Sequence, residues 1–237
     1  MKSKHMLLAT ILMGILLFVG CSDDDDDDTI TRTFTIRIEN ISDSSALPTP
    51  LAPGPFAVHT TPYVIFQSGQ NDFGDGLEAI AEDGDPTMLD GNLANHANVS
   101  EHGVFNTPTN AGEPGPLFPG SGEAYEFTFT ASRGDRISFA TMLVQSNDLF
   151  FAPSDRGLDL FNGYTPLNGD ITGQIMLWDA GTEVNEQPGV GPNQAPRQSG
   201  PNTGPTENGP VRLISDVNDG YVYPPVTSLI RVMISSQ

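Results

Sequence analysis

Short segments in which apolar and polar residues alternate recur along this chain, and they limit the folds open to it. The clearest is TFTIRIENI, in which Phe34, Ile36 and Ile38 alternate with polar side chains, the pattern of a half-buried β-strand. Further strands are predicted over residues 123–131, 136–145, 173–179, 211–217 and 228–236. The 25 Gly and 20 Pro gather between these segments, where turns require them. The pattern predicts an all-β fold, an antiparallel β-sandwich.

Helix signals are scarce in this sequence. The segment DGLEAIAEDGD is one short helix candidate, with Asp75 as its cap and Gly84 as its stop. The segment PFAVHTTPYVIF reads as a strand or a strand pair interrupted by Pro62. Residues 189–210 are rich in Gly and Pro, and a connection of that length is usually functional or disordered. We therefore expect at most one short helix and long Gly/Pro-rich loops.

The first residues indicate export. MKSKHMLLATILMGILLFVGC has a basic start, an apolar run and a small residue before Cys21, which is the layout of a secretory signal. The ending FVGC resembles a bacterial lipobox, in which the cysteine is lipidated. The alternative is a free cysteine after an ordinary signal. We expect a lipoprotein signal peptide over residues 1–20, lipidated Cys21 with an acidic linker over residues 21–32, and one domain over residues 33–237.

Six consecutive aspartates follow directly after Cys21 and Ser22. Such a run repels itself and is typical of a solvated spacer, although a weak calcium reservoir is another use. A cysteine followed by an acidic run also resembles a surface-export signal of bacterial lipoproteins. We expect a protein anchored by lipid to the outer membrane and exposed at the cell surface, with a periplasm-facing anchor as the alternative.

The charge balance excludes one class of partner. The chain has 10 Lys and Arg against 30 Asp and Glu, and both lysines, Lys2 and Lys4, lie in the signal. Nucleic-acid binding needs a basic surface, so we expect none. An acidic surface suits divalent cations, but it also suits a salty habitat. Because Cys21 is the single cysteine, an intramolecular disulfide is impossible.

Catalytic motifs are absent, and the histidines form no recognised zinc pattern. There is no G-x-S-x-G, H-E-x-x-H, P-loop or dinucleotide fingerprint. His96 and His102 are six residues apart in a loop-like stretch, which is not a zinc-ligand spacing. His59 lies in a strand segment, where a buried and hydrogen-bonded role is favoured over a catalytic one. The sequence predicts a protein that is not an enzyme.

One stretch, IMLWDAGTEVNEQPGVG, places two carboxylates around a turn. In a continued strand Asp179 and Glu183 would lie roughly 13 Å apart, too far to share an ion. Gly181 allows a sharp turn between them, because glycine accepts positive φ. Calcium prefers carboxylate and carbonyl oxygens, so a folded-back pair is a candidate site, although the EF-hand pattern is not met. An ordinary surface turn is the alternative, because Asp, Gly and Thr also serve turns alone.

The combination of MLVQSNDLFF with LWDAGTEVNE resembles the spondin domain of extracellular matrix and bacterial secreted proteins, over about residues 34–236. This resemblance implies an antiparallel β-sandwich related to C2 domains. It also implies one bound Ca²⁺, with Asp148, Asp179 and Glu183 as ligands. Glu183 departs from the Asp that is common at its position. The possible rim of the site comprises Asn147, Trp178, Asn185 and Glu186, with Trp178 expected either to pack in the core beneath the site or to be exposed for stacking.

These observations predict a non-enzymatic, calcium-binding adhesion or binding module, tethered as a lipoprotein outside the cytoplasm. The long Gly/Pro-rich loop would contact an unknown protein, glycan or matrix ligand, and the membrane would be reached through the lipid anchor only. One alternative is a secreted glycan-active hydrolase that uses paired carboxylates. The other is a C2-like domain that contacts membranes in the presence of calcium.

Overall fold

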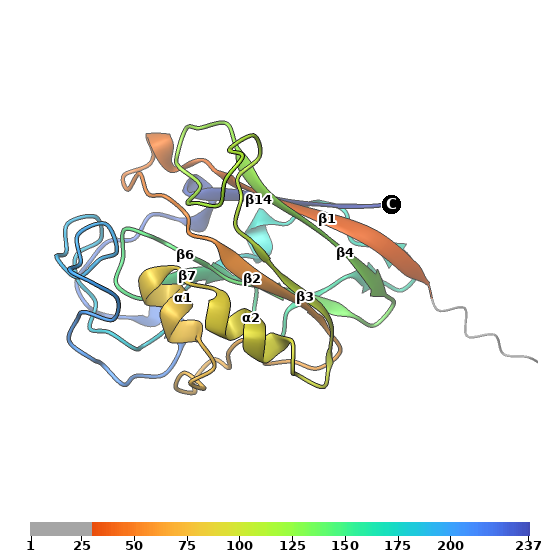
Figure 1. Cartoon of the computed structure of the whole chain (residues 1–237), viewed down its shortest axis with the longest axis horizontal. Coiled ribbons are helices and arrows are strands. Elements are labelled where there is room, and N and C mark those ends of the chain that lie inside the picture. Colours follow the sequence, from red (N-terminus) through yellow and green to blue (C-terminus); the bar gives the residue numbers. More distant parts are fainter. Residues whose placement is uncertain (1–29) are drawn as a thin grey trace, which may run out of the picture.

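One sheet joins strands from the beginning, middle and end of the chain (Figure 1). The computed structural model describes residues 30–237. Every pairing in this sheet is antiparallel, and its order is β11 (Gly169–Asp170), β14 (Ile230–Ser236), β1 (Thr31–Asn40) and β4 (Ala124–Ser132). Along β1, the predicted alternation is confirmed, because Phe34, Ile36 and Ile38 are buried while the residues between them are partly exposed.

A second layer consists of two four-stranded sheets whose strands interleave along the chain. The first has the order β3 (Val99–Phe105), β2 (Gly54–His59), β5 (Arg136–Phe139) and β8 (Leu158–Asp159). The second has the order β13 (Arg212–Leu213), β12 (Met176–Asp179), β7 (Leu149–Ala152) and β6 (Thr141–Met142). Only Ala140 separates β5 from β6, so the two sheets continue into each other. A small hairpin pairs β9 (Phe161–Asn162) with β10 (Thr165–Pro166).

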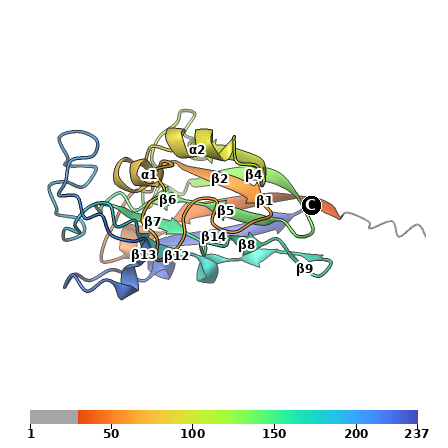
Figure 2. The same cartoon turned by 90° about the horizontal axis from the view of Figure 1, so that it is seen from below.

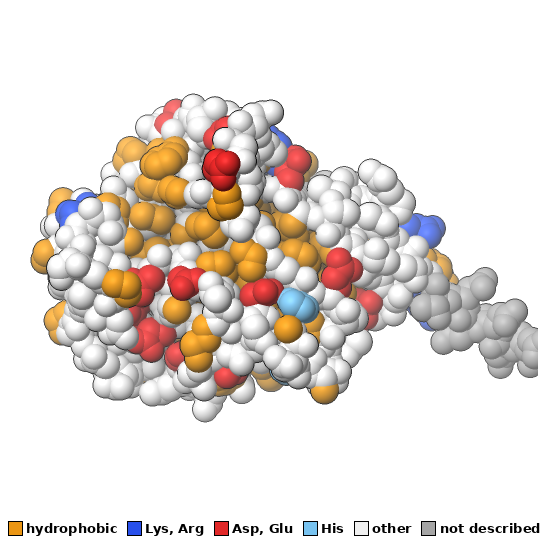
Figure 3. Space-filling view, in the orientation of Figure 1, with side chains coloured by type: hydrophobic (Ala, Val, Ile, Leu, Met, Phe, Trp, Pro, Cys, Tyr) orange, Lys and Arg blue, Asp and Glu red, His pale blue; other side chains and the backbone are white. Residues whose placement is uncertain are grey.

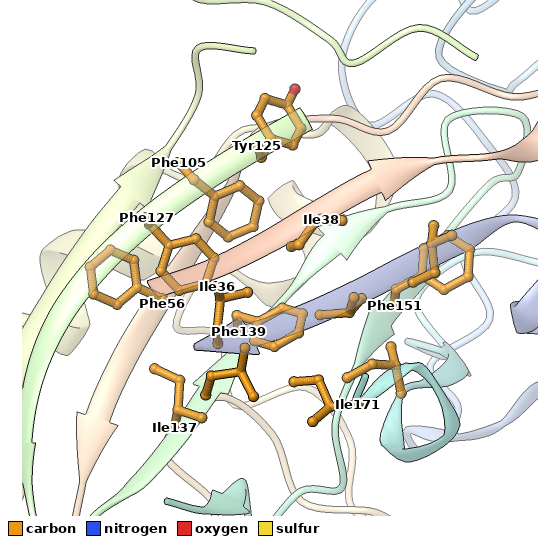
Figure 4. Close-up of a cluster of buried hydrophobic side chains, with 14 of the residues drawn as sticks. Ile36, Ile38, Phe56, Phe105, Tyr125, Phe127, Ile137, Phe139, Phe151 and Ile171 are labelled. Carbon is orange, nitrogen blue, oxygen red and sulfur yellow. The ribbon is translucent and has the colours of Figure 1, made fainter. Parts of the chain in front are cut away.

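The main core lies between these two layers and is rich in aromatic rings (Figure 4). Phe127 of β4 stacks on Phe56 of β2 with ring centroids 4.6 Å apart, and on Phe105 of β3 at 5.0 Å. Burying rings of this size supplies much of the energy of a β-sandwich. The fold class predicted from the alternating segments is confirmed: the structure is an all-β, sandwich-like fold.

Two short helices cover the outer face of the second layer, α1 (Leu77–Asp83) and α2 (Thr87–Leu93) (Figure 2). Their apolar residues form a second core with Phe150 and Trp178. Because β7 faces the main core on one side and the helices on the other, all four of its residues are buried.

The helix prediction needs two corrections. Residues 30–237 contain two α-helices where at most one helix was predicted, because burial of Leu89 and Leu93 stabilises α2 despite its weak helix signal. Asp75 does not cap α1: the cap position is Gly76, without a side-chain hydrogen bond. Gly84 ends α1 as predicted, with a φ of 68°.

The first strand starts two residues before the predicted start of the domain at residue 33. Strand β1 begins at Thr31, because residues 31 and 32 pair with Ser132 and Ala131 of β4. The predicted signal peptide, Cys21 and the acidic run lie outside the described residues. Within residues 30–237, no helix has both the length and the apolar character needed to cross a membrane.

The two ends of the sandwich differ. The start of β1 and the C-terminus lie together at one end, and the amide of Gln237 donates to the Thr33 carbonyl over 2.9 Å. The Gly/Pro-rich stretch of residues 187–210, here called the long loop, projects at the opposite end (Figures 1 and 2). The predicted acidic site lies at this second end, beside the long loop.

Candidate functional site

Antiparallel pairing of β7 and β12 brings two sequence-distant acids together. Asp179 ends β12 opposite Leu149, and Asp148 immediately precedes Leu149. The Ala180 amide donates to the Asp148 carbonyl over 3.1 Å, which closes the strand pair. Gly181 then turns the chain with a φ of 70°, a conformation that costs glycine nothing. The turn that the sequence predicted at Gly181 is therefore present, but the two carboxylates have different partners, Asn185 for Asp179 and Asn147 for Glu183.

Asp148 lies under this turn and is fully buried. Its Oδ2 accepts hydrogen bonds from the backbone amides of Thr182, over 2.9 Å, and Glu183, over 3.1 Å. Its Oδ1 is also buried but has no hydrogen-bond partner. Burial raises the pKa of the Asp148 carboxyl, and the neighbouring Asp179 carboxylate raises it further, against the effect of the two amides. An unpartnered buried carboxylate oxygen is unfavourable unless a proton or a cation meets it.

Asp179 is fully buried, but both of its oxygens have partners. Oδ1 accepts from the Gly181 amide over 2.7 Å, and Oδ2 accepts from Asn185 Nδ2 over 2.7 Å. Arg212 lies 3.4 Å from Oδ2 and also pairs with Glu207 at 2.5 Å. Burial raises the pKa of Asp179, while Asn185 and Arg212 act in the opposite direction.

Glu183 is 3 % exposed and is held by Asn147. Asn147 Nδ2 donates to Glu183 Oε2 over 3.2 Å, and Asn147 Oδ1 accepts from the Glu186 amide over 3.0 Å. Burial raises the pKa of Glu183, and the Asn147 bond lowers it. Of the predicted rim residues, Asn147 and Asn185 therefore hold the acids in place, and Glu186 binds Asn193 of the long loop instead.

Trp178 lies beneath the turn as core packing. It is 4 % exposed, its ring centroid lies 4.9 Å from that of Phe66, and its indole N–H donates to the Ala152 carbonyl over 3.3 Å. The interpretation of Trp178 as a buried packing residue is confirmed, and the exposed stacking alternative is wrong.

The long loop folds back over the acidic turn instead of projecting freely. The Gly209 amide donates to the Gly181 carbonyl over 2.7 Å, and the Glu207 amide donates to the Thr182 carbonyl over 2.8 Å. Gly204 packs so closely on Glu183 that a Cβ there would collide with the Glu183 carboxylate. The inner side of the loop thus covers the acids.

Helix α1 brings a fourth buried acid, Glu82, which the sequence did not indicate. Glu82 is 2 % exposed, and neither carboxylate oxygen has a well-formed hydrogen bond, although the Thr182 hydroxyl lies close enough to act on it. Burial raises the pKa of Glu82 to about 8; the Thr182 hydroxyl lowers it, and the carboxylates of Glu183, Glu78 and Asp148 raise it. Acidic side chains also gather on the surface around α1 (Figure 3). Spacing could not reveal Glu82, because only the packing of α1 on the turn brings it near the other acids.

The chemistry of these oxygens fits calcium better than it fits a structural zinc. Carboxylate and hydroxyl oxygens are hard ligands, and the described part of the chain has no cysteine near them. Within residues 30–237, no three Asp, Glu, His or Cys side chains already converge as a finished ligand set. The unpartnered Oδ1 of Asp148 nevertheless leaves an acceptor that a cation could meet.

The histidines take no part in this site. His59 is fully buried, and its ring nitrogens contact the Thr61 carbonyl over 2.5 Å and the Ser138 hydroxyl over 2.9 Å. The prediction of a buried, hydrogen-bonded histidine is confirmed. His102 pairs with Asp90 over 2.7 Å on the helix side of the molecule.

Comparison of the chain with protein families and with curated proteins gives no match.

Proposed function

We propose that this chain is a non-enzymatic, calcium-binding module that is exported, anchored by lipid through Cys21, and binds a partner outside the cytoplasm. The observation that carries the proposal is the fully buried, unpartnered Oδ1 of Asp148 beside the Asp179 carboxylate. Two buried carboxylates this close repel each other, and a divalent cation relieves that repulsion. Calcium suits a site made of carboxylates and waters.

Three residues would hold the ion: Asp148, Asp179 and Glu183. Asp148 offers its unpartnered Oδ1, and Glu183 offers the carboxylate that Asn147 holds. Asp179 supplies further negative charge, which Arg212 partly offsets. When bound, calcium supplies charge neutralisation and cross-links the turn to the start of β7.

The long loop would connect the ion to a partner. Its inner side covers Glu183 and the turn, while Val190 on its outer side is 61 % exposed. Ordering the turn would therefore order a surface that a protein, glycan or matrix ligand can contact. Nucleic acid is not the expected partner, given a net charge of −20.

The burial of the acids argues against the hydrolase alternative. Asp148, Asp179 and Glu183 are 0 to 3 % exposed, so a sugar could reach them only after the long loop moved away. Calcium-dependent membrane contact is disfavoured by the acidic composition, because anionic lipid surfaces attract basic segments. Sedimentation with liposomes, with and without calcium, tests that alternative.

Calorimetric titration of the chelator-treated protein with CaCl₂ tests the proposal. We expect saturable binding of one ion, together with a higher melting temperature in calcium than in chelator. Asp179→Asn should weaken both effects. If Asp179→Asn leaves calcium binding and calcium stabilisation unchanged, the assigned site is wrong.

A further inference from the structure

Glu82 is a buried acid without a basic partner among the groups that shift its pKa. It lies in the last turn of α1 with 2 % of its surface exposed, neither Oε1 nor Oε2 has a well-formed hydrogen bond, and the Thr182 hydroxyl is the donor that lowers its pKa. The groups that act on it electrostatically include the carboxylates of Glu183, Glu78 and Asp148. An ionised carboxylate in such a place is costly, so the fold requires either a proton or a cation there.

The long loop closes the same region from the other side. Asn202 donates to Glu78 of α1 over 2.6 Å, and Gly204 packs against the Glu183 carboxylate. Thr203 lies between these two contacts, and its hydroxyl oxygen is likewise buried without a partner. The unpartnered buried oxygens near the turn thus belong to Asp72, Glu82, Asp148 and Thr203, which come from the loop before α1, from α1, from the start of β7 and from the long loop.

The partners of Asp179 indicate on which side of the turn an ion would lie. Both Asp179 oxygens are engaged, and Arg212 places a positive charge beside them. The Arg212 charge repels a metal ion from the neighbourhood of Asp179, so the ion is expected on the side of the turn that has no arginine. That side faces α1.

We propose that Glu82 is a further ligand of the calcium site, and that the ion lies on the α1 side of the turn, between Glu82, Asp148 and Glu183. Asp179, whose oxygens are both engaged, then contributes negative charge beside the ion and no ligand oxygen. This inference rests on the proposed function, and it adds the helix to the site. Calcium takes six to eight oxygens, and three of the six carboxylate oxygens of Asp148, Asp179 and Glu183 already accept hydrogen bonds from Gly181, Asn185 and the turn amides, so both oxygens of Glu82 would add needed ligands. The ion would then join α1 to the β-sandwich.

Calorimetric titration of the purified full-length protein with CaCl₂ tests this, using Glu82→Gln and the control Glu78→Gln. Both variants lose one negative charge from α1, but Glu78 already has a hydrogen bond to Asn202. We expect Glu82→Gln to lower calcium affinity by at least about tenfold, since even residues that only support ligands cost 10–100-fold. Glu78→Gln should lower it by less than about threefold, because its effect is long-range and screened.

Thermal unfolding separates a ligand from a packing residue. In chelator, Glu82→Gln should melt at the same or a higher temperature than the wild type, because glutamine has the same shape without the cost of burying an ionisable carboxyl group. In calcium, the wild type should gain stability and Glu82→Gln should gain much less. A purely structural Glu82 would instead lower the melting temperature equally in both conditions, which would overturn the inference.

The outcomes distinguish the two proposals. If the wild type binds calcium and Glu82→Gln binds it equally well, Glu82 is a buried neutral acid and only this inference fails. If the wild type itself shows no binding, the proposed function fails as well. Should Glu82→Gln not fold, Glu82→Asp keeps the charge on a shorter arm. Weaker binding by that variant supports the inference, and unchanged binding contradicts it.

Discussion

Buried polar side chains divide into two kinds in this protein. Those at the acidic turn include oxygens without partners, namely Asp148 Oδ1 and both Glu82 oxygens. His59, by contrast, is fully buried with both ring nitrogens in contact with an oxygen. The first kind leaves hydrogen-bond acceptors without a donor, which suits the binding of a ligand. In the second kind the protein itself supplies the polar contacts, so the residue serves the fold.

His59 should make the folded state sensitive to acid. Burial lowers its pKa; the Thr61 carbonyl raises it, Arg136 and His96 lower it, and Asp135 raises it. The unfolded chain binds a proton near pH 6.5 and the folded chain does not, so stability falls as the pH drops below about 6.5. His59→Gln should flatten the dependence of unfolding free energy on pH by up to about 1.4 kcal/mol per pH unit between pH 6.5 and 5.

Urea unfolding at several pH values measures this effect. His102→Gln, which removes a histidine from the helix side of the molecule, serves as the control. His59→Gln is expected to lower stability at every pH, because it breaks contacts, so only the slope is diagnostic. If unfolding free energy depends on pH as steeply in His59→Gln as in the wild type, His59 is protonated as readily in the folded chain as in the unfolded one.

At the level of elements, the acidic turn and the long loop depend on two glycines in different ways. Gly181 has positive φ, and a Cβ there would lie 2.7 Å from the Gly209 carbonyl oxygen, which is fixed backbone. Gly204 lacks positive φ, and a Cβ there would meet only the end of the flexible Glu183 side chain. One glycine is needed by the backbone, and the other leaves room for a carboxylate.

Alanine substitutions should therefore have different consequences. Gly181→Ala should lower the unfolding free energy by roughly 1–3 kcal/mol in chelator, because the backbone is strained. Gly204→Ala should cost less stability but weaken calcium binding, because it displaces the Glu183 carboxylate. Denaturant unfolding in chelator and calcium titration measure the two effects. Equal losses of stability with unchanged calcium affinity would show that Gly204 only shapes the loop.

Element by element, the sequence predicted what depends on local pattern and missed what depends on packing. The alternation of Phe34, Ile36 and Ile38 is enough to predict β1, because one face of that strand is buried. Helix α2 was missed because its residues TMLDGNL include Gly and Asp, so that only tertiary burial of Leu89 and Leu93 stabilises it. Asp179 and Glu183 were found through the turn at Gly181, whereas Glu82 reaches the site only through helix packing.

At the scale of the whole molecule, Trp178 reports on the contact between the helices and the second layer of the sandwich. It is the single tryptophan, and it belongs to the cluster shared by the helices and the outer face of β7 and β12. We expect unfolding followed by tryptophan fluorescence and by far-ultraviolet circular dichroism to give coincident transitions, as in a two-state domain. Calcium should shift both transitions upward together. A shift in fluorescence alone would show that the end bearing the acids unfolds separately.

The position of β1 has a mechanical consequence. This strand begins at the end of the sandwich where an N-terminal tether would attach, and it runs toward the end that carries the long loop. It is paired along most of its length with β4 on one side and with β14 on the other. A pull between the tether and a partner at the far end would load these two ladders in shear, with many hydrogen bonds resisting at once. A lipid-tethered adhesin under flow needs this kind of resistance, because peeling a strand away one bond at a time requires far less force.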